Sequence, residues 1–299
     1  MIAIDWGSTS LRAYRLDTMG RVREQRRADI GALGQDGRHA AIVAAQIEGW
    51  DDEQIVLCGM AGARGGWQEA AYVECPADAA AIAASMLHVD VSNSPLRGRT
   101  VRIVPGVIDR GVSDRATGDV ADVMRGEETQ VIGLMHGAVD PPVDVCLPGT
   151  HSKWVALRAG AIASVHTAMT GEVYALMRLH SVLARLMAAD DAPIDADTFT
   201  AGVRRSGDAG GLLHHLFGVR TQGLLGRLSA EQAPGYLSGL LVGHEIRARL
   251  PLPPTVHVVA GDALADAYGL ALAEFGVEGR RHPEHLAASG AFALLHAAP

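Results

Sequence analysis

Residues 1–14 of the chain read MIAIDWGSTSLRAY. An apolar run ends at the acid Asp5, and a turn of small residues, Gly7-Ser8-Thr9-Ser10, leads into a second strand-like run. This pattern predicts a β-hairpin with a tight turn. Because the turn has no bulky side chain, its backbone N–H groups and hydroxyls can approach an oxyanion. The hairpin is therefore a candidate phosphate-binding turn, with an ordinary first hairpin as the alternative.

A second hairpin of the same type is predicted in residues 143–158, which read VDVCLPGTHSKWVALR. When Gly149 is aligned with Gly7, both glycines follow an apolar strand, precede a Ser/Thr-rich turn and lead into another strand. Helices and strands follow both hairpins, and the two glycines are about 140 residues apart. The sequence therefore predicts an internally duplicated α/β protein.

The remaining elements follow from hydrophobic periodicity and turn residues. We predict strands at Arg21–Ala28, Gln54–Cys58, Val101–Val104, Ala161–Thr167 and Thr255–Ala260. We predict helices at His39–Trp50, Pro76–Leu87, Asp119–Met135, Glu172–Met187, Ala196–Arg205, Gly211–Phe217, Ala233–Leu250, Asp262–Phe275 and Pro283–His296. The segment His136–Pro142 is a predicted linker between two domains.

Composition narrows the functional class. Among 299 residues, 20% are charged and 48% are hydrophobic, as in ordinary soluble globular proteins. The 26 basic residues are outnumbered by 34 acidic ones, which argues against nucleic acid as the partner. The three cysteines are far apart, so neither a disulfide framework nor a cysteine metal cluster is expected. With no signal-peptide pattern and no long apolar run, we expect a cytoplasmic protein that does not bind membranes.

Several segments in consistent order resemble the 2-dehydro-3-deoxygalactonokinase family of the actin-like ATPase superfamily, which includes sugar kinases, heat-shock chaperones and actin. They are residues 4–13 (IDWGSTSLRA), 59–62 (GMAG), 123–133 (VMRGEETQVIG), 148–155 (PGTHSKWV), 169–172 (MTGE), 238–243 (SGLLVG) and 259–264 (VAGDAL). The two hairpins alone are typical of the superfamily only. The complete series is specific to the family, and it runs through the whole chain.

This resemblance implies an α/β fold with two ribonuclease H-like (actin-like ATPase) domains and ATP in the cleft between them. Residues 1–140 are the expected N-terminal domain, and residues 141–299 are the expected C-terminal domain. The implied activity is that of an ATP- and Mg²⁺-dependent carbohydrate kinase in galactonate catabolism. It transfers the γ-phosphoryl group to the 6-hydroxyl of 2-dehydro-3-deoxy-D-galactonate. The expected partner is this small sugar acid, and a homodimer is compatible with the resemblance.

Nucleotide binding is assigned to three turns. The first hairpin contributes Asp5, Gly7, Ser8 and Thr9, with Asp5 acting through Mg²⁺. The second contributes Gly149, Thr150, His151 and Lys153, although Lys153 can instead point to solvent or to an acid. By superfamily position, Gly261 and Asp262 are expected at the adenosine. The alternative for these last two residues is a plain helix start capped by Asp262.

The metal assignment takes account of a departure from the superfamily. Many relatives carry an acid two residues before the second glycine, where this chain has Leu147. Metal binding is therefore assigned mainly to Asp5, with Glu172 as a second candidate. The alternative for Glu172 is a first-turn acid that complements the helix dipole.

A catalytic base is expected in the segment Arg125-Gly126-Glu127-Glu128-Thr129-Gln130. A glutamate near a polyanion and a metal can accept a proton from a primary hydroxyl. Adjacent helical carboxylates point about 100° apart, so only one faces the cleft, and we choose Glu127 over Glu128. Gly126 indicates a helix start or a close backbone approach. Two solvated helix acids are the alternative.

The substrate carboxylate requires cations, and arginine provides a bidentate match. Arg12, Arg64 and Arg125 each lie in or beside a segment shared with the family. Trp67, in the glycine-rich loop after residues 54–58, can pack against the sugar or can anchor the loop to the core.

Three other functions remain open. One is a kinase for a different sugar acid or ketose. Another is a phosphoanhydride hydrolase of exopolyphosphatase type, which predicts a basic channel that the sequence lacks. A nucleotide-gated regulatory protein without turnover fits poorly, because both candidate glutamates are present and no DNA-binding domain is evident.

Overall fold

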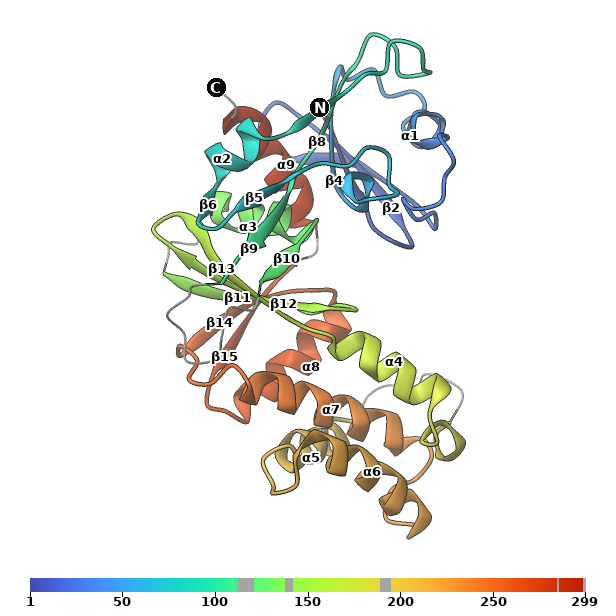
Figure 1. The fold of residues 1–299 in the computed structure, drawn as a ribbon, viewed down its shortest axis with the longest axis vertical. Helices are drawn as coiled ribbons and strands as arrows, with labels where there is room; N and C mark the ends of the chain where they lie inside the picture. The colour runs from blue at the N-terminus through green and yellow to red at the C-terminus, as the bar shows by residue number, and fades with distance from the viewer. Residues whose placement is uncertain (112–120, 138–141, 189–194, 284, 298–299) are drawn as a thin grey trace. The chain divides into compact units, whose positions relative to one another are not determined.

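The structure is a computed structural model that describes residues 1–111, 121–137, 142–188, 195–283 and 285–297 (Figure 1). The chain divides into two compact units, which are treated separately below. The first contains residues 1–143, 155–166 and 284–299, and the second contains residues 144–154 and 167–283. The predicted domain boundary after residue 140 and most of the predicted linker lie outside the described residues. Among the described helices, none has the length and apolar character needed to cross a bilayer.

The first six-stranded sheet has the order β3-β2-β1-β4-β8-β7. Its strands are β1 (Ile2–Trp6), β2 (Leu11–Leu16), β3 (Val22–Ala28), β4 (Gln54–Gly59), β7 (Leu87–Val89) and β8 (Thr100–Ile103). Strands β1 and β2 pair antiparallel, which confirms the predicted first hairpin. Strand β4 runs parallel to both β1 and β8, so the carboxyl ends of β1 and β4 meet at one edge of the sheet.

The second six-stranded sheet has the order β15-β14-β11-β12-β13-β6. Its strands are β6 (Ala77–Asp78), β11 (Val143–Leu147), β12 (Ser152–Arg158), β13 (Ala161–Ala168), β14 (Thr255–Val259) and β15 (Glu278–His282). Here too, the first strand of a hairpin lies beside a parallel fourth strand, and its second and third strands follow on the other side. The repeated order confirms the predicted duplication.

A three-stranded sheet in the first unit corrects one prediction. It has the order β10-β9-β5, made of β10 (Asp122–Met124), β9 (Gly106–Asp109) and β5 (Tyr72–Glu74). The predicted helix Asp119–Met135 is therefore wrong at its start, because residues 122–124 pair with β9 and the helix begins at Glu127. The predicted helix Pro76–Leu87 is likewise wrong at both ends, where Ala77–Asp78 form β6 and Leu87 begins β7. Residues 119 and 120 lie outside the described residues. Gly126, with φ of +107°, separates strand from helix.

The other helices agree with prediction in position more than in length. They are α1 (His39–Gln46), α2 (Ala79–Ala84), α3 (Glu127–His136), α4 (Thr170–His180), α5 (Ala196–Arg205), α6 (Gly211–Leu224), α7 (Gln232–Arg247), α8 (Asp262–Ala273) and α9 (Leu286–Ala297). Helix α2 starts later than predicted because Asp78 caps it, accepting a hydrogen bond from the Ala81 N–H at 2.8 Å. Helix α4 ends at His180, and a short 3₁₀ helix (Ala184–Leu186) follows; another lies at Met60–Gly62.

Packing in the first unit determines which way Asp5 points. Ile2, Ile4 and Trp6 join an apolar cluster with Val43 of α1. Because side chains alternate along a strand, Asp5 lies on the opposite face of β1.

Close helix pairs rely on glycine in both units. For example, a Cβ on Gly290 of α9 would lie 1.8 Å from the Thr129 carbonyl oxygen of α3.

Candidate active site

The first hairpin turn is closed by its own backbone. The Gly7 N–H donates to the Ser10 carbonyl at 2.9 Å, and the Gly7 carbonyl accepts from the Ala32 N–H at 3.0 Å. Gly31 supports the turn from behind, because a Cβ there would lie 1.9 Å from the Ser8 carbonyl oxygen. Ser8 and Thr9 are exposed at the tip. Backbone hydrogen bonds therefore fix the turn at Gly7, while the two side chains at its tip stay exposed.

Asp5 lies at the end of β1 beside a cation and a thiol. Arg12 is its direct partner across the hairpin, and Arg12 Nη1 lies 3.4 Å from Asp5 Oδ2. The buried Cys58 Sγ lies 4.0 Å from the other carboxylate oxygen. Burial, followed by the charges of Asp5 and Glu128, raises the pKa of Cys58 well above its usual range. Both carboxylates therefore lie close to this thiol.

Helix α3 begins against the end of β4. A Cβ on Gly126 would lie only 3.1 Å from the Gly59 Cα, and one on Gly59 would lie 2.8 Å from the Trp6 carbonyl oxygen. Both glycines have positive φ, which a side chain would strain. The structure therefore shows at Gly126 both features that the sequence suggested, a helix start and a close backbone approach. This approach brings the first turn of α3 to the carboxyl ends of β1 and β4.

The two adjacent glutamates of α3 differ sharply in environment. Glu127 is partly exposed, and its Oε2 accepts from the Arg125 N–H at 3.1 Å. Glu128 is 0% exposed and accepts from the Gly126 N–H at 2.7 Å and the Thr129 hydroxyl at 3.0 Å. Burial, followed by the charge of Glu127, raises the pKa of Glu128 to about 8. Glu127 is therefore the more accessible carboxylate of the pair.

The predicted substrate residues occupy different settings. Arg64 is exposed in the loop after β4. Arg125 donates through Nη2 to the Ala70 carbonyl at 2.8 Å, and its guanidinium lies 4.4 Å from the centre of the Tyr72 ring. Its Nε and Nη1 are buried without a hydrogen-bond partner among the residues that the structure describes. Trp67 stacks on the buried His39 at 6.1 Å and packs against the core.

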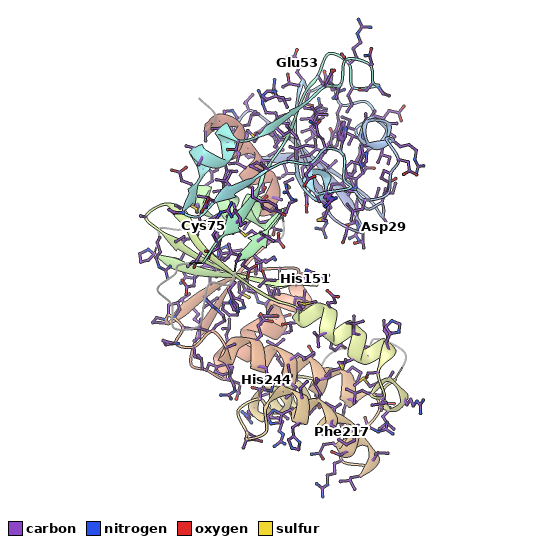
Figure 2. The ribbon with its side chains drawn as sticks, viewed as in Figure 1. Asp29, Glu53, Cys75, His151, Phe217 and His244 are labelled. Atoms are coloured by element: carbon purple, nitrogen blue, oxygen red, sulfur yellow. The ribbon has the colours of Figure 1, made fainter. Side chains whose placement is uncertain are left out.

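The second hairpin is supported by a helix. A Cβ on Gly171 of α4 would lie 2.3 Å from the Gly149 carbonyl oxygen, and the Glu172 N–H donates to the Thr150 carbonyl at 2.9 Å. Figure 2 shows the His151 side chain at this turn, where its Nε2 pairs with Glu172 Oε2. The start of α4 thus brings Glu172 to the second turn, as a first-turn acid that also pairs with His151.

Lys153 follows the second turn on β12. It is 8% exposed, and its Nζ donates to the Thr167 hydroxyl of β13 at 2.8 Å. Its side chain therefore does not extend into solvent. Leu147, at the position where many relatives carry an acid, is a buried core residue at the end of β11. The second hairpin thus has no acid at the strand position where the first hairpin carries Asp5.

A buried carboxylate that sequence analysis missed lies beneath the second hairpin. Glu245 of α7 is 7% exposed and accepts from Trp154 Nε1 at 2.8 Å, from the Tyr268 hydroxyl at 2.8 Å and from the Thr170 hydroxyl. Tyr268 also bonds the Ser152 hydroxyl at 2.8 Å. Burial raises the pKa of Glu245, and these hydrogen bonds act against the rise.

The sequence contained a sign of this group. Leu237, Leu241 and Glu245 are spaced four residues apart on α7, so they share one buried face. An acid at a core position of an apolar helix requires hydrogen-bond partners. That spacing would have marked Glu245 as a buried polar centre, although its partners come from three other elements.

The predicted adenosine turn joins β14 to α8. Gly261 precedes α8 in extended conformation, and Asp262 is exposed in the first helical turn. Gly261 occupies the capping position itself, so Asp262 is not the N-cap that the alternative interpretation required.

Comparisons with known proteins identify the family. The family model described as 2-keto-3-deoxy-galactonokinase matches residues 5–294. The chain belongs to this family. A 2-dehydro-3-deoxygalactonokinase of Escherichia coli (strain K12) is 35% identical over 283 residues, covering 93% of this chain and 90% of that protein.

Solved structures agree with this membership. A Sinorhizobium meliloti crystal structure, of a protein proposed to be a 2-dehydro-3-deoxygalactonokinase, has a TM-score of 0.87 at 34% identity, covering 99% of this chain and 96% of the other. The activator of 2-hydroxyisocaproyl-CoA dehydratase from Clostridium difficile has a TM-score of 0.53 at 11% identity, covering 99% of this chain and 95% of the other. That second similarity shows the fold alone, and with the repeated strand order it confirms the predicted actin-like ATPase fold class.

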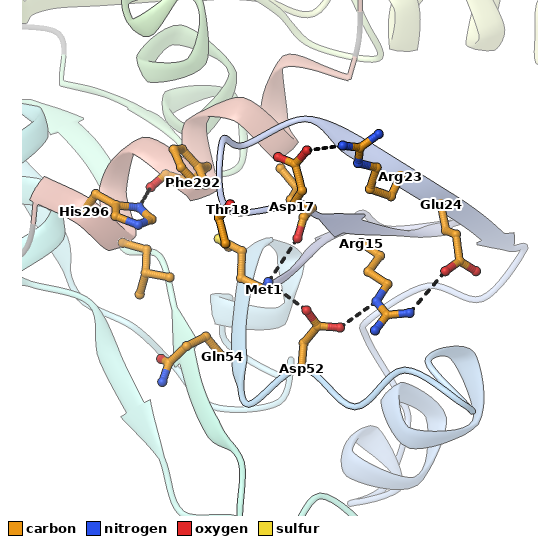
Figure 3. Close-up of a pocket in the computed structure, with 12 residues that line it drawn as sticks. Met1, Arg15, Asp17, Thr18, Arg23, Glu24, Asp52, Gln54, Phe292 and His296 are labelled. Carbon is orange, nitrogen blue, oxygen red and sulfur yellow. Dashed lines mark hydrogen bonds and ion pairs between the residues drawn. The ribbon is translucent and has the colours of Figure 1, made fainter.

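The first unit contains a pocket of about 570 Å³ (Figure 3). It lies at the opposite end of β1 from Asp5, and none of the predicted site residues lines it. Its charges pair with one another: the Met1 amine and Arg15 with Asp52, and Arg23 with Asp17. In open α/β sheets, ligands bind at the carboxyl ends of the strands, so we do not assign the reaction to this pocket.

Proposed function

We propose that this chain is an ATP-dependent kinase for 2-dehydro-3-deoxy-D-galactonate. It transfers the γ-phosphoryl group to the 6-hydroxyl and gives 2-dehydro-3-deoxy-6-phosphogalactonate, a step of galactonate catabolism. The observation that carries the proposal is the placement of Asp5 and Glu127 at the joined carboxyl ends of β1 and β4 in a member of this family. The E. coli relative, which bears the name of this activity, covers 93% of the chain.

Glu127 is the proposed catalytic base. Its partly exposed carboxylate accepts a proton from the 6-hydroxyl as the oxygen attacks phosphorus. Glu128 has no access to substrate; it holds the first turn of α3 through the Gly126 N–H and thereby supports the position of Glu127.

Asp5 suits a hydrated Mg²⁺. The ion takes oxygen ligands and keeps several waters, so one or two carboxylates with the nucleotide phosphates suffice. Asp5 offers a half-buried carboxylate beside the hydroxyl-rich turn, while the described residues contain no cluster of three or more metal-ligating side chains. When bound, Mg²⁺ neutralises phosphate charge. Glu172 is the proposed second, weaker contact to its water shell.

The two turns are proposed to bind phosphate through backbone N–H groups and hydroxyls. Gly7, Ser8 and Thr9 serve this role in the first unit, and Gly149 and Thr150 serve it in the second. Lys153 adds positive charge near the second turn, and His151 is proposed as a further phosphate contact. Gly261 and Asp262 are proposed to contact the adenosine, where the small residues of the β14–α8 turn permit close approach.

The substrate carboxylate requires an accessible cation. We propose that exposed Arg64 binds it, with Arg12 beside the first turn as the second contact. Arg125 and Trp67 are proposed to shape the loop on which Arg64 lies, because Arg125 bonds the Ala70 carbonyl and Trp67 packs on His39.

A coupled ADP-release assay tests the proposal. Purified protein with ATP and Mg²⁺ is given 2-dehydro-3-deoxy-D-galactonate, its gluconate epimer, or no acceptor. We expect rapid turnover with the galactonate acid and at least tenfold less with the epimer, since a site that hydrogen-bonds a hydroxyl rejects its misplaced form. Equal ADP release without acceptor would replace the kinase with a phosphoanhydride hydrolase. Faster turnover with the epimer would indicate a different sugar acid.

A further inference from the structure

The buried network centred on Glu245 joins four separate elements of the second unit. Trp154 and Ser152 come from β12, directly after the second turn, and Thr170 is the first residue of α4. Tyr268 belongs to α8, and Glu245 itself belongs to α7. Each of the first three elements begins beside a residue that the proposed function assigns to the nucleotide.

The distances along the chain are short. Lys153 lies between Ser152 and Trp154, and Glu172 is two residues after Thr170. Helix α8 starts at Asp262, less than two turns before Tyr268. The carboxylate of Glu245 thus holds the second turn, the start of α4 and the start of α8 in one arrangement.

The hydrogen bonds to the Glu245 carboxylate fix the geometry of the network. A buried carboxylate is costly unless donors surround it, and here the Trp154 indole bonds one oxygen while two hydroxyls bond the other. The indole N–H can only donate, so it requires an acceptor in this position. A shift of Trp154 would leave its buried indole N–H without this acceptor, and a shift of Tyr268 or Thr170 would remove one of the two donors to the other oxygen.

We propose that Glu245 is a positioning residue for nucleotide binding, which fixes the second turn relative to α4 and α8 so that all three meet the nucleotide in a preset arrangement. This inference rests on the proposed function, because it requires that these elements bind ATP. Glu245 does not touch the nucleotide itself. Preset donors bind more tightly because less motion is lost on binding.

The test compares variants of the complete chain by the KM for ATP, the KM for the sugar acid, and calorimetric binding of MgADP. Glu245→Ala removes the shared acceptor, and we expect the KM for ATP and the Kd for MgADP to rise about tenfold or more. Tyr268→Phe and Thr170→Val each remove one donor and should raise both by about threefold. The KM for the sugar acid should remain within about twofold.

Glu245→Gln serves as the conservative rescue. Its amide oxygen can accept from Trp154, and its NH₂ can donate to both hydroxyls, so affinity should stay within about threefold of wild type. Ser206→Ala is the matched control. Ser206 is also buried in the second unit and bonds Arg247 Nε at 2.8 Å, but it contacts neither the second turn nor α4. It should lower the melting temperature and leave MgADP affinity unchanged.

Two results would overturn the inference. If Tyr268→Phe and Thr170→Val lower the melting temperature like Ser206→Ala while binding MgADP as wild type does, the network is structural only. These mild variants decide the matter even if Glu245→Ala does not fold. If wild-type protein binds no MgADP and releases no ADP with the sugar acid, the proposed function itself fails, and this inference fails with it.

Discussion

The two hairpins occupy the same place in their sheets, yet the first strand of one ends with an acid and the first strand of the other ends with an apolar residue. Aligned on Gly7 and Gly149, Asp5 corresponds to Leu147, and Arg12 corresponds to Trp154. The first pair is an ion pair across β1 and β2 at 3.4 Å. In the second, both residues are buried, and the indole donates to Glu245 from α7. The acid that pairs with the second position thus comes from β1 in the first hairpin and from helix α7 in the second.

The turns also differ in what supports them. A loop glycine, Gly31, lies behind the first turn, whereas the helix glycine Gly171 lies behind the second. The aligned position after the turn is Leu11 in one and Lys153 in the other. Duplication has therefore kept the strand order, whereas the side chains at the aligned positions differ. We propose that the roles divide accordingly, with Asp5 holding the metal in the first unit and Lys153 contacting phosphate in the second.

The largest effect on kcat should come from replacing Asp5, compared with the same replacement at the aligned Leu147. Asp5→Asn removes the proposed metal carboxylate but preserves size, and we expect kcat to fall about a thousandfold, because metal stabilisation of charge contributes several kcal/mol. Leu147→Asn makes the same residue at the aligned site. It should lower the melting temperature by placing an amide in the core, with kcat within about threefold. Steady-state ADP release and calorimetry measure both. A kcat within tenfold of wild type for Asp5→Asn would contradict the division of roles.

The next largest effect on kcat should distinguish the adjacent acids Glu127 and Glu128. Glu127→Gln should lower kcat about a hundredfold with little change in either KM, because a general base contributes mainly in the transition state. Glu128→Gln should retain kcat within about fivefold, since its amide can still accept from the Gly126 N–H. Single-turnover rates for both variants make the comparison. Should the Glu128 variant be the slower one, the base is Glu128.

The stability of the folded protein should depend on pH through the buried Glu128. Its pKa is raised from 4.5 to about 8, so the folded protein holds a proton that the unfolded chain releases between these values. The sign is therefore a loss of stability as pH rises. From pH 5.5 to 7, this one group can remove about 2 kcal/mol.

Urea unfolding of wild type and Glu128→Gln at several pH values checks this effect. The glutamine variant lacks the titrating proton, so its stability relative to wild type should increase as pH rises. Titrations that both proteins share cancel in that difference. A difference that stays constant from pH 5.5 to 8 would show that Glu128 is already ionised when buried.

Both hairpins and most helices can be predicted from the sequence, because the patterns that mark them are local. Apolar runs, glycine-containing turns and helix periodicity marked both hairpins and most helices within a few residues. No strand is predicted at β5, β6, β7, β9, β10 or β15. The pairing of β5, β9 and β10, for example, depends on residues 72–74 finding residues 106–109 and 122–124. Such short strands carry little periodicity of their own, so the sequence pattern predicts helix at residues 122–124.

In the candidate site, too, features with a local cause can be predicted from the sequence, and features that depend on distant residues cannot. Gly126 was correctly interpreted, because a glycine at a helix start has a local cause. Glu245 was missed because its partners, Trp154, Thr170 and Tyr268, come from distant parts of the chain. Single-sequence patterns show which residue types are present, whereas the burial that distinguishes Glu128 from Glu127 arises only when α3 packs against the rest of the first unit.

The smallest effect concerns Glu172 and tests whether the second hairpin also reaches the metal. Its carboxylate pairs with His151, and both side chains are more than a third exposed, so the pair itself contributes little to stability. If Glu172 contacts the water shell of Mg²⁺, Glu172→Gln should raise the Mg²⁺ concentration for half-maximal activity by about threefold, less than Asp5→Asn. His151→Gln removes the partner but no carboxylate, so it should leave that concentration unchanged. Titrating Mg²⁺ at saturating ATP separates them. An identical Mg²⁺ response in both variants and wild type would make Glu172 a first-turn acid paired with His151, and would leave metal binding to the first hairpin alone.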